Sequence, residues 1–201
     1  MATLKPYWVF MLYLIQLTAF EFFKMCQRVW WKLSGVQKHI NKCYHDDQYD
    51  MSVQCLRVWG KCKPSPLTIP QLHHFLTTHV KFVNPEYALG KHVTLLAVND
   101  KDAIFGVFSP QEDIYNVRKW PFLYIAEFQT AEHILVMPMT SFIRLANKLG
   151  DPRSKVIWVH STGRCGSTAL AQAFNSLPDV LAMAEPMCFF SLKQKLFEKE
   201  V

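Results

Sequence analysis

Hydrophobic and polar residues follow a different pattern in each part of the 201-residue chain. Residues 7–23 are mostly apolar, interrupted by Gln16 and Glu21, and this pattern predicts an N-terminal apolar helix within residues 1–33. Residues 34–66 combine glycines, prolines and a polar run with little periodicity. Such a composition is typical of a linker, so we expect an irregular segment there.

A small α+β segment is predicted for residues 67–150. Apolar positions recur at helical spacing after Thr68, which predicts a helix that begins there and includes Val80. From about residue 92 the pattern becomes strand-like. The predicted elements are a hairpin of Val93–Val98 and Ala103–Phe108, strands at Phe122–Phe128 and His133–Met137, and a helix from Ser141 to Lys148 closed by Gly150. We expect the acidic residues of this segment on its solvated surface: Glu112, Asp113, Glu127 and Glu132.

The pattern changes again in residues 151–201. An apolar run, Val156–Val159, is followed by small and polar residues and then by a stretch of helical composition, Ala169–Phe174. The order strand, glycine-bearing loop and helix places backbone N–H groups at a helix N-terminus, where an anion can bind. We therefore expect an anion-binding loop between the two elements.

The loop also offers side chains that suit an anion. Arg164 can donate two parallel hydrogen bonds to a phosphate or sulfate, and Gly166 allows the backbone to approach it closely. Ser167 and Thr168 add hydroxyl donors at the helix start. An ATP-binding Walker A loop is disfavoured, because serines stand where that motif needs its first glycine and its lysine. The alternative is a plain strand-to-helix turn with a capping serine.

The stretch STGRCGSTAL resembles the 5′-phosphosulfate loop of the PAPS-dependent sulfotransferases. The matching residues are Thr162, Gly163, Arg164, Cys165, Gly166, Ser167 and Thr168, with Cys165 where serine is usual. The stretch LPDVLAMAEPMCFF resembles the second strand of that fold, which ends near a glutamate, here Glu185. Together the two motifs cover about residues 155–190.

The resemblance implies an α/β fold with a P-loop sulfotransferase-like parallel sheet, whose first two strands would be Val156–Ser161 and Val180–Glu185. It implies that a hydroxyl or amine acceptor attacks the sulfur of PAPS and that 3′,5′-ADP leaves. Arg164 and the loop N–H groups would neutralise charge on the 5′-phosphate. Glu185 would be the general base, although an exposed carboxylate or a simple pair with Arg164 is an equal alternative.

The resemblance further implies a second motif, an arginine and a serine that bind the 3′-phosphate. We do not find it in these 201 residues and expect the sheet to be incomplete at the C-terminus. We therefore expect no sulfate transfer by this chain. It would be either a fragment of a longer enzyme or a non-catalytic relative. The second hypothesis is a membrane-attached binding or scaffold protein that keeps a vestigial anion-binding loop. The acceptor is not specified by the sequence.

Charge and cysteine content add little to this picture. A formal net charge of +6 suits an anionic partner such as a nucleotide, but there is no Lys/Arg block of five or more, so we expect no nucleic-acid partner. Four of the six cysteines lie between residues 26 and 62 with His39 and His45, yet none forms a CxxC pair. We expect ordinary thiols or a lumenal disulfide there, and no metal.

The N-terminal apolar run favours membrane association through residues 7–23. Its length is at the short limit for a spanning helix, so single-pass insertion, an interfacial helix and a buried helix all stay open. Basic residues are more numerous after the run than before it, which is the reverse of what a lumenal enzyme requires. A Golgi and a cytoplasmic location are therefore both retained.

Overall fold

The computed structural model describes residues 6–45, 48–162 and 165–198. The chain divides into two compact parts, residues 1–42 and 43–201. The first part consists mainly of α1, a 28-residue helix from Pro6 to Leu33, so the predicted apolar helix is present and extends well past its apolar run. Gly35, with φ of 77°, separates α1 from α2 (Val36–His45). Within the described ranges no helix combines the length and apolarity needed to cross a membrane.

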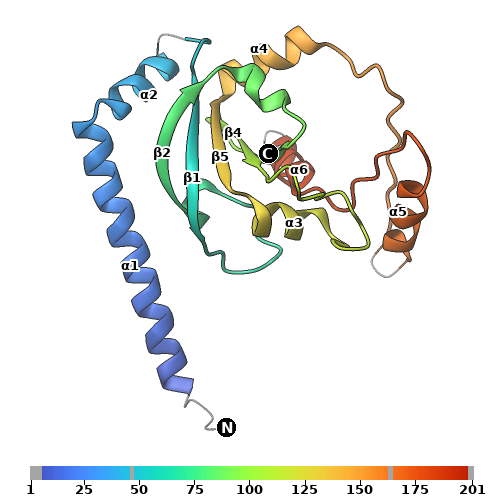
Figure 1. Cartoon of the computed structure of the whole chain (residues 1–201), viewed down its shortest axis with the longest axis horizontal. Helices are drawn as coiled ribbons and strands as arrows, with labels where there is room; N and C mark the ends of the chain where they lie inside the picture. Colours follow the sequence, from blue (N-terminus) through green and yellow to red (C-terminus); the bar gives the residue numbers. More distant parts are fainter. Residues whose placement is uncertain (1–5, 46–47, 163–164, 199–201) are drawn as a thin grey trace. The chain divides into compact units, whose positions relative to one another are not determined.

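The second part is built on a five-stranded sheet with the order β2-β1-β5-β4-β3 (Figure 1). Its strands are β1 (Val53–Lys61), β2 (Phe75–Val83), β3 (Val93–Val98), β4 (Asp102–Val107) and β5 (His133–Pro138). Its helices are α3 (Leu123–Thr130), α4 (Met139–Leu149), α5 (Ser167–Asn175) and α6 (Met187–Glu198), with 3-10 turns at Leu72–His74 and Pro85–Leu89.

The fold therefore contains helices and a sheet, as expected, but the predicted parallel sheet is wrong for the described residues. Every pair of neighbouring strands is antiparallel. For β3 and β4 the connection, residues 99–101, is too short for a parallel pair, which needs a crossover of a dozen or more residues. The β3–β4 hairpin shows the local cause: the Asn99 side-chain carbonyl accepts hydrogen bonds from the N–H groups of Lys101 and Asp102, at 2.9 and 2.8 Å, and closes the turn.

Both faces of the sheet are buried. Ala103, Phe105, Leu135 and Met137 point to one face, where they pack with Leu145 of α4. The alternate residues Leu56, Ile104, Ile134 and Val136 point to the other face and are also buried. At the edge of the sheet α6 packs against β3, and the N–H of Val98 donates to the hydroxyl of Ser191 at 3.0 Å.

Several predicted elements are correct because their signals are local. The hairpin, the strand at 133–137 and the helix ended by Gly150 are all present. Three others are wrong: residues 34–66 contain α2 and β1, the predicted helix from Thr68 is a 3-10 turn followed by β2, and the predicted strand at 122–128 is α3. In the first two cases pairing of β1 with both β2 and β5 decides the structure, and that pairing is not visible in local sequence.

Candidate functional site

The segment that leads to the predicted loop has no regular structure. Residues 155–162 form neither helix nor strand, so the predicted strand Val156–Ser161 is wrong. The side chains of Val156 to Val159 are 53–67% exposed. A strand needs a neighbour to pair its backbone groups, and none of the described residues provides one. The run touches the fold through Trp158, whose ring meets that of Phe189 edge-on at 4.6 Å between centroids.

The helix after the loop is present as predicted. α5 begins at Ser167, with Gly166 as its N-cap at φ 86° and ψ 16°. This left-handed conformation is strained for residues that carry a Cβ, so glycine is the natural choice there. The N–H of Leu170 donates to the Gly166 carbonyl at 3.1 Å and closes the first turn. The N–H groups of Ser167 and Thr168 precede this bond and are available to the loop.

Cys165 lies in the loop with its side chain exposed, near Ser161 and Ser167. The hydroxyl of Ser161, and then the N–H and hydroxyl of Ser167, lower the pKa of the Cys165 thiol below its ordinary value. The donors that the loop offers to an anion therefore converge on this sulfur. Ser161 was not among the predicted site residues. Thr162 is exposed, while Gly163 and Arg164 lie outside the described residues.

Asn175 fixes the other end of α5. Its side-chain amide donates to the carbonyl of Tyr115 at 2.8 Å, and its side-chain carbonyl accepts from the N–H of Ala182 at 2.8 Å. Tyr115 belongs to the segment between β4 and α3, so this one asparagine links α5 to the sheet-bearing part of the fold.

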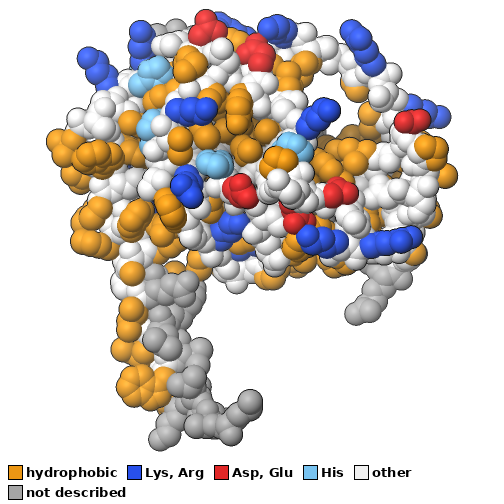
Figure 2. All heavy atoms as spheres, viewed as in Figure 1, with side chains coloured by type: hydrophobic (Ala, Val, Ile, Leu, Met, Phe, Trp, Pro, Cys, Tyr) orange, Lys and Arg blue, Asp and Glu red, His pale blue; other side chains and the backbone are white. Residues whose placement is uncertain are grey.

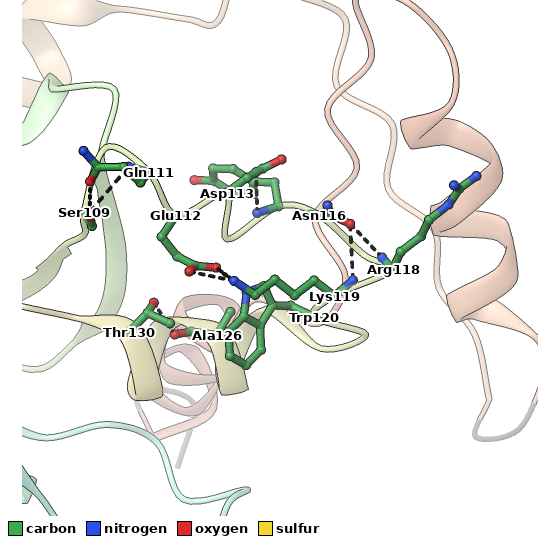
Figure 3. Close-up of polar contacts among 11 residues, drawn as sticks. Ser109, Gln111, Glu112, Asp113, Asn116, Arg118, Lys119, Trp120, Ala126 and Thr130 are labelled. Atoms are coloured by element: carbon green, nitrogen blue, oxygen red, sulfur yellow. Dashed lines mark hydrogen bonds and ion pairs between the residues drawn. The ribbon is translucent and has the colours of Figure 1, made fainter.

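That segment is itself held by polar contacts (Figure 3). The ammonium of Lys119 donates to both oxygens of Glu112, at 2.7 and 2.8 Å, and the indole N–H of Trp120 donates to one of them at 2.7 Å. These bonds hold the pKa of Glu112 below its usual range. The side-chain carbonyl of Asn116 accepts from the backbone N–H groups of Arg118 and Lys119. Glu112 thus links Lys119 and Trp120 and helps to hold this segment in place.

Glu185 lies just before α6 and is exposed. The predicted strand Val180–Glu185 is wrong: the segment is irregular, and its Ala184 carbonyl accepts a hydrogen bond from the N–H of Leu123 at 2.8 Å. Glu185 has φ of 54°, and no described residue forms a hydrogen bond or ion pair with it, loop residues included. Burial of Tyr124 raises the pKa of its hydroxyl, and the charge of Glu185 raises it further. The structure therefore does not join Glu185 to the described part of the loop.

A different glutamate, Glu127 on α3, is fully buried, which corrects the expectation that it is solvated. Neither of its carboxylate oxygens has a hydrogen-bond partner among the described residues. Burial raises the pKa of Glu127 to about 8, against a smaller lowering by the charge of Lys63. Burial and then the charge of Glu127 raise the pKa of Cys188 to about 11. Burial therefore favours the protonated form of the Glu127 carboxyl group.

Only the position of Glu127 within an apolar run, between Ala126 and Phe128, signals its burial in the sequence. A run of this length does not distinguish a strand from a buried helix. As a strand it would have turned every second side chain outward. As α3 it places Leu123, Ala126 and Glu127 all in the interior.

Two hollows lie elsewhere on the second part of the chain. One, of about 260 Å³, is lined by residues from the start of β3 and just before it and by residues of the 108–115 segment, including Thr94, Glu112 and Tyr115. This volume is below the range of about 300–1,000 Å³ usual for ligand pockets. The other is an open groove of about 800 Å³ between residues 57–61 and 130–133. Neither is lined by any of the predicted site residues, so the loop remains the candidate site.

Comparison with known proteins adds no assignment: no family model, curated protein or solved structure matches the chain. No group of described residues has the composition and proximity of a metal site. The chemistry of the loop, its geometry and its resemblance are therefore the basis for a proposed function.

Proposed function

We propose that the loop of residues 161–168 binds the 5′-phosphosulfate group of PAPS, and that the chain is a sulfotransferase-like protein. One observation carries the proposal: Gly166, in a left-handed conformation, starts α5 so that the first-turn N–H groups and the Ser167 and Thr168 side chains follow directly after the loop. The dipole of α5 favours negative charge at that end. The convergence of Ser161 and Ser167 on the Cys165 sulfur gives further support, because the same donors suit an anionic oxygen.

The proposed chemistry assigns one role to each charged group. An acceptor hydroxyl or amine attacks the sulfur of PAPS, the bond from sulfur to the bridging oxygen breaks, and 3′,5′-ADP leaves with that electron pair. Arg164 neutralises the charge that develops on the 5′-phosphate. Glu185 takes the acceptor proton in this scheme. Because no hydrogen bond or ion pair joins Glu185 to the described loop residues and the 3′-phosphate motif is not found in the sequence, we expect this chain to bind the nucleotide without transferring sulfate.

The test is calorimetric titration of the full chain with 3′,5′-ADP, with ATP as the competing nucleotide. We expect saturable binding of 3′,5′-ADP that is lost in Arg164→Ala. Arg153→Ala is the matched control, since Arg153 is an exposed arginine in the segment that leads to the loop. Absence of binding by the folded protein, or equal loss in both variants, contradicts the proposal. Detectable sulfate transfer from PAPS contradicts the expected lack of turnover.

A second function, a non-catalytic membrane-attached binding or scaffold protein, is favoured by α1, whose large apolar side chains are exposed along its length. In that case the loop is vestigial, and attachment depends on residues 7–23, either across the bilayer or at its surface, on the Golgi or the cytoplasmic side. Deletion of residues 7–23 then releases the protein from membranes. Arg164→Ala then changes neither folding nor location.

A further inference from the structure

The net positive charge of the protein is concentrated in its first part. Residues 1–42 contain six Lys or Arg and a single acidic residue, Glu21, so they carry five of the six net charges of the chain. The remaining 159 residues contain 16 Lys or Arg and 15 Asp or Glu and are almost neutral. A basic segment attached to a nearly neutral body indicates that an anionic surface is the partner of this segment and not of the body.

The charges in α1 lie along one side of its second half. Glu21, Lys24, Arg28 and Lys32 are separated by three, four and four residues, which is the spacing of a single helix stripe. Lys24 pairs with Glu21 at 2.8 Å and packs over the Phe20 ring at 4.4 Å, so its side chain is mostly covered. Arg28 and Lys32 are exposed and supply the positive charge of the stripe.

The opposite side of the second half is apolar and uncovered. Large exposed side chains occupy it: Phe22, Trp30 and Leu33, with Trp30 66% and Leu33 78% exposed. In Figure 2 hydrophobic side chains cover much of the described part of α1. Aromatic side chains such as that of Trp30 are enriched at the boundary between headgroups and acyl chains. The second half of α1 is therefore an amphipathic helix with a basic face.

The first half of α1 is different, because residues 7–20 contain no charged residue at all. Tyr7, Phe10, Met11 and Ile15 are exposed there. The hydroxyl of Thr18 donates to the backbone carbonyls of Leu14 and Ile15, at 3.0 and 2.9 Å, which satisfies this polar group inside the helix. Fourteen residues of helix extend about 21 Å, less than the roughly 30 Å of a bilayer core.

We propose that α1 lies in the surface of an anionic phospholipid bilayer, with Arg28 and Lys32 among the lipid headgroups and its apolar side toward the acyl chains. Lys38 and Lys42 of α2 are exposed and four residues apart, and they extend the same basic segment beyond Gly35. No acidic residue lies between Phe22 and His45 to oppose them. The inference rests on the proposed membrane association and specifies its orientation and lipid class; it is independent of the nucleotide loop.

The test is flotation of the full-length protein with vesicles of phosphatidylcholine alone, and with vesicles in which about a third of the lipid is phosphatidylserine. We expect binding to the anionic vesicles that weakens as salt is raised. In Arg28→Gln/Lys32→Gln this binding falls by about 25-fold, since each basic residue near such a surface contributes roughly fivefold. The control, Lys91→Gln/Lys101→Gln, removes the same charge from exposed lysines of the second part and leaves binding nearly unchanged.

A second variant tests the apolar side. Trp30→Ala is expected to weaken binding to both kinds of vesicle, because it removes interfacial area and no charge. Equal binding of the protein to neutral and anionic vesicles overturns the lipid assignment but leaves membrane association intact. An equal loss of vesicle binding in the two double variants overturns the proposal that the anionic lipid surface contacts α1. No binding to any vesicle overturns the proposal. Self-association without lipid that changes in Trp30→Ala also overturns it and assigns the apolar side to contact with another copy of the chain. Nucleotide titration of the same samples reports on the loop independently.

Discussion

Two apolar runs of similar composition lie in opposite environments in this chain. In β5 the residues Ile134 to Met137 are at most 6% exposed, whereas Val156 to Val159 are more than half exposed. β5 lies between β1 and β4 and pairs with both, while the later run pairs with no described strand. Whether an apolar run is buried therefore depends on the strands available to pair with it. Its composition alone does not predict which strands these are.

The largest effect expected from this difference is on stability. Ile134→Ala removes a fully buried side chain from β5 and should lower the free energy of unfolding by about 3 kcal/mol. Ile157→Ala makes the same chemical change in the exposed run and should alter it by less than about 0.5 kcal/mol. Urea unfolding followed by circular dichroism measures both. Similar losses in the two variants mean that the 156–159 run is packed in solution.

The same contrast between interior and surface applies to two glutamates and predicts a pH dependence. With a native pKa of about 8 and an ordinary value of 4.5 when unfolded, Glu127 keeps a proton that the unfolded chain releases between these values. The stabilisation of the folded state by this retained proton is complete below pH 4.5 and is lost as pH rises toward 8. The free energy of unfolding therefore falls by up to about 1.4 kcal/mol per pH unit in this window.

Glu127→Gln should abolish that slope, and Glu185→Gln, at an exposed position, should leave it unchanged. Unfolding curves across pH 5–8 for the three proteins provide the measurement. A slope that persists in Glu127→Gln assigns the titration to another group.

The smallest effect concerns reactivity within the loop. Hydrogen bonds from Ser161 and Ser167 lower the pKa of the Cys165 thiol, so more of it is thiolate at neutral pH. We expect Cys165 to react with iodoacetamide several-fold faster than Cys26, which is exposed on α1. Mass spectrometry after brief alkylation measures both sites in one sample. Ser161→Ala should slow Cys165 alone, and 3′,5′-ADP should protect it. Equal rates at the two cysteines contradict the loop geometry.

Local signals in the sequence predicted part of this molecule well. Asn99 closes the β3–β4 turn with its own side chain, Gly150 ends α4 and Gly166 starts α5, and each acts within a few residues of its position. Such signals do not depend on the rest of the fold. That is why the elements beside them were predicted correctly.

The errors occur where distant segments decide the structure. β1 was expected to be irregular, yet it lies between β2 and β5 and is hydrogen-bonded to both. α3 was expected to be a strand, because its apolar run gives no period that separates the two structures. For the site, the start of α5 was predictable, but the irregular segment before Glu185 and the burial of Glu127 depend on tertiary packing.

The position of α6 has a consequence for the lifetime of the protein in a crowded solution. β3 is an end strand of the sheet, with one side unpaired by any other strand, and α6 packs against it while Ser191 accepts from Val98. An uncovered end strand can recruit a strand from another molecule and begin a chain of intermolecular pairing. By packing on this end strand, α6 therefore opposes strand pairing between two copies of the protein. Loss of α6 would expose this edge of β3 to pairing with a strand of another molecule.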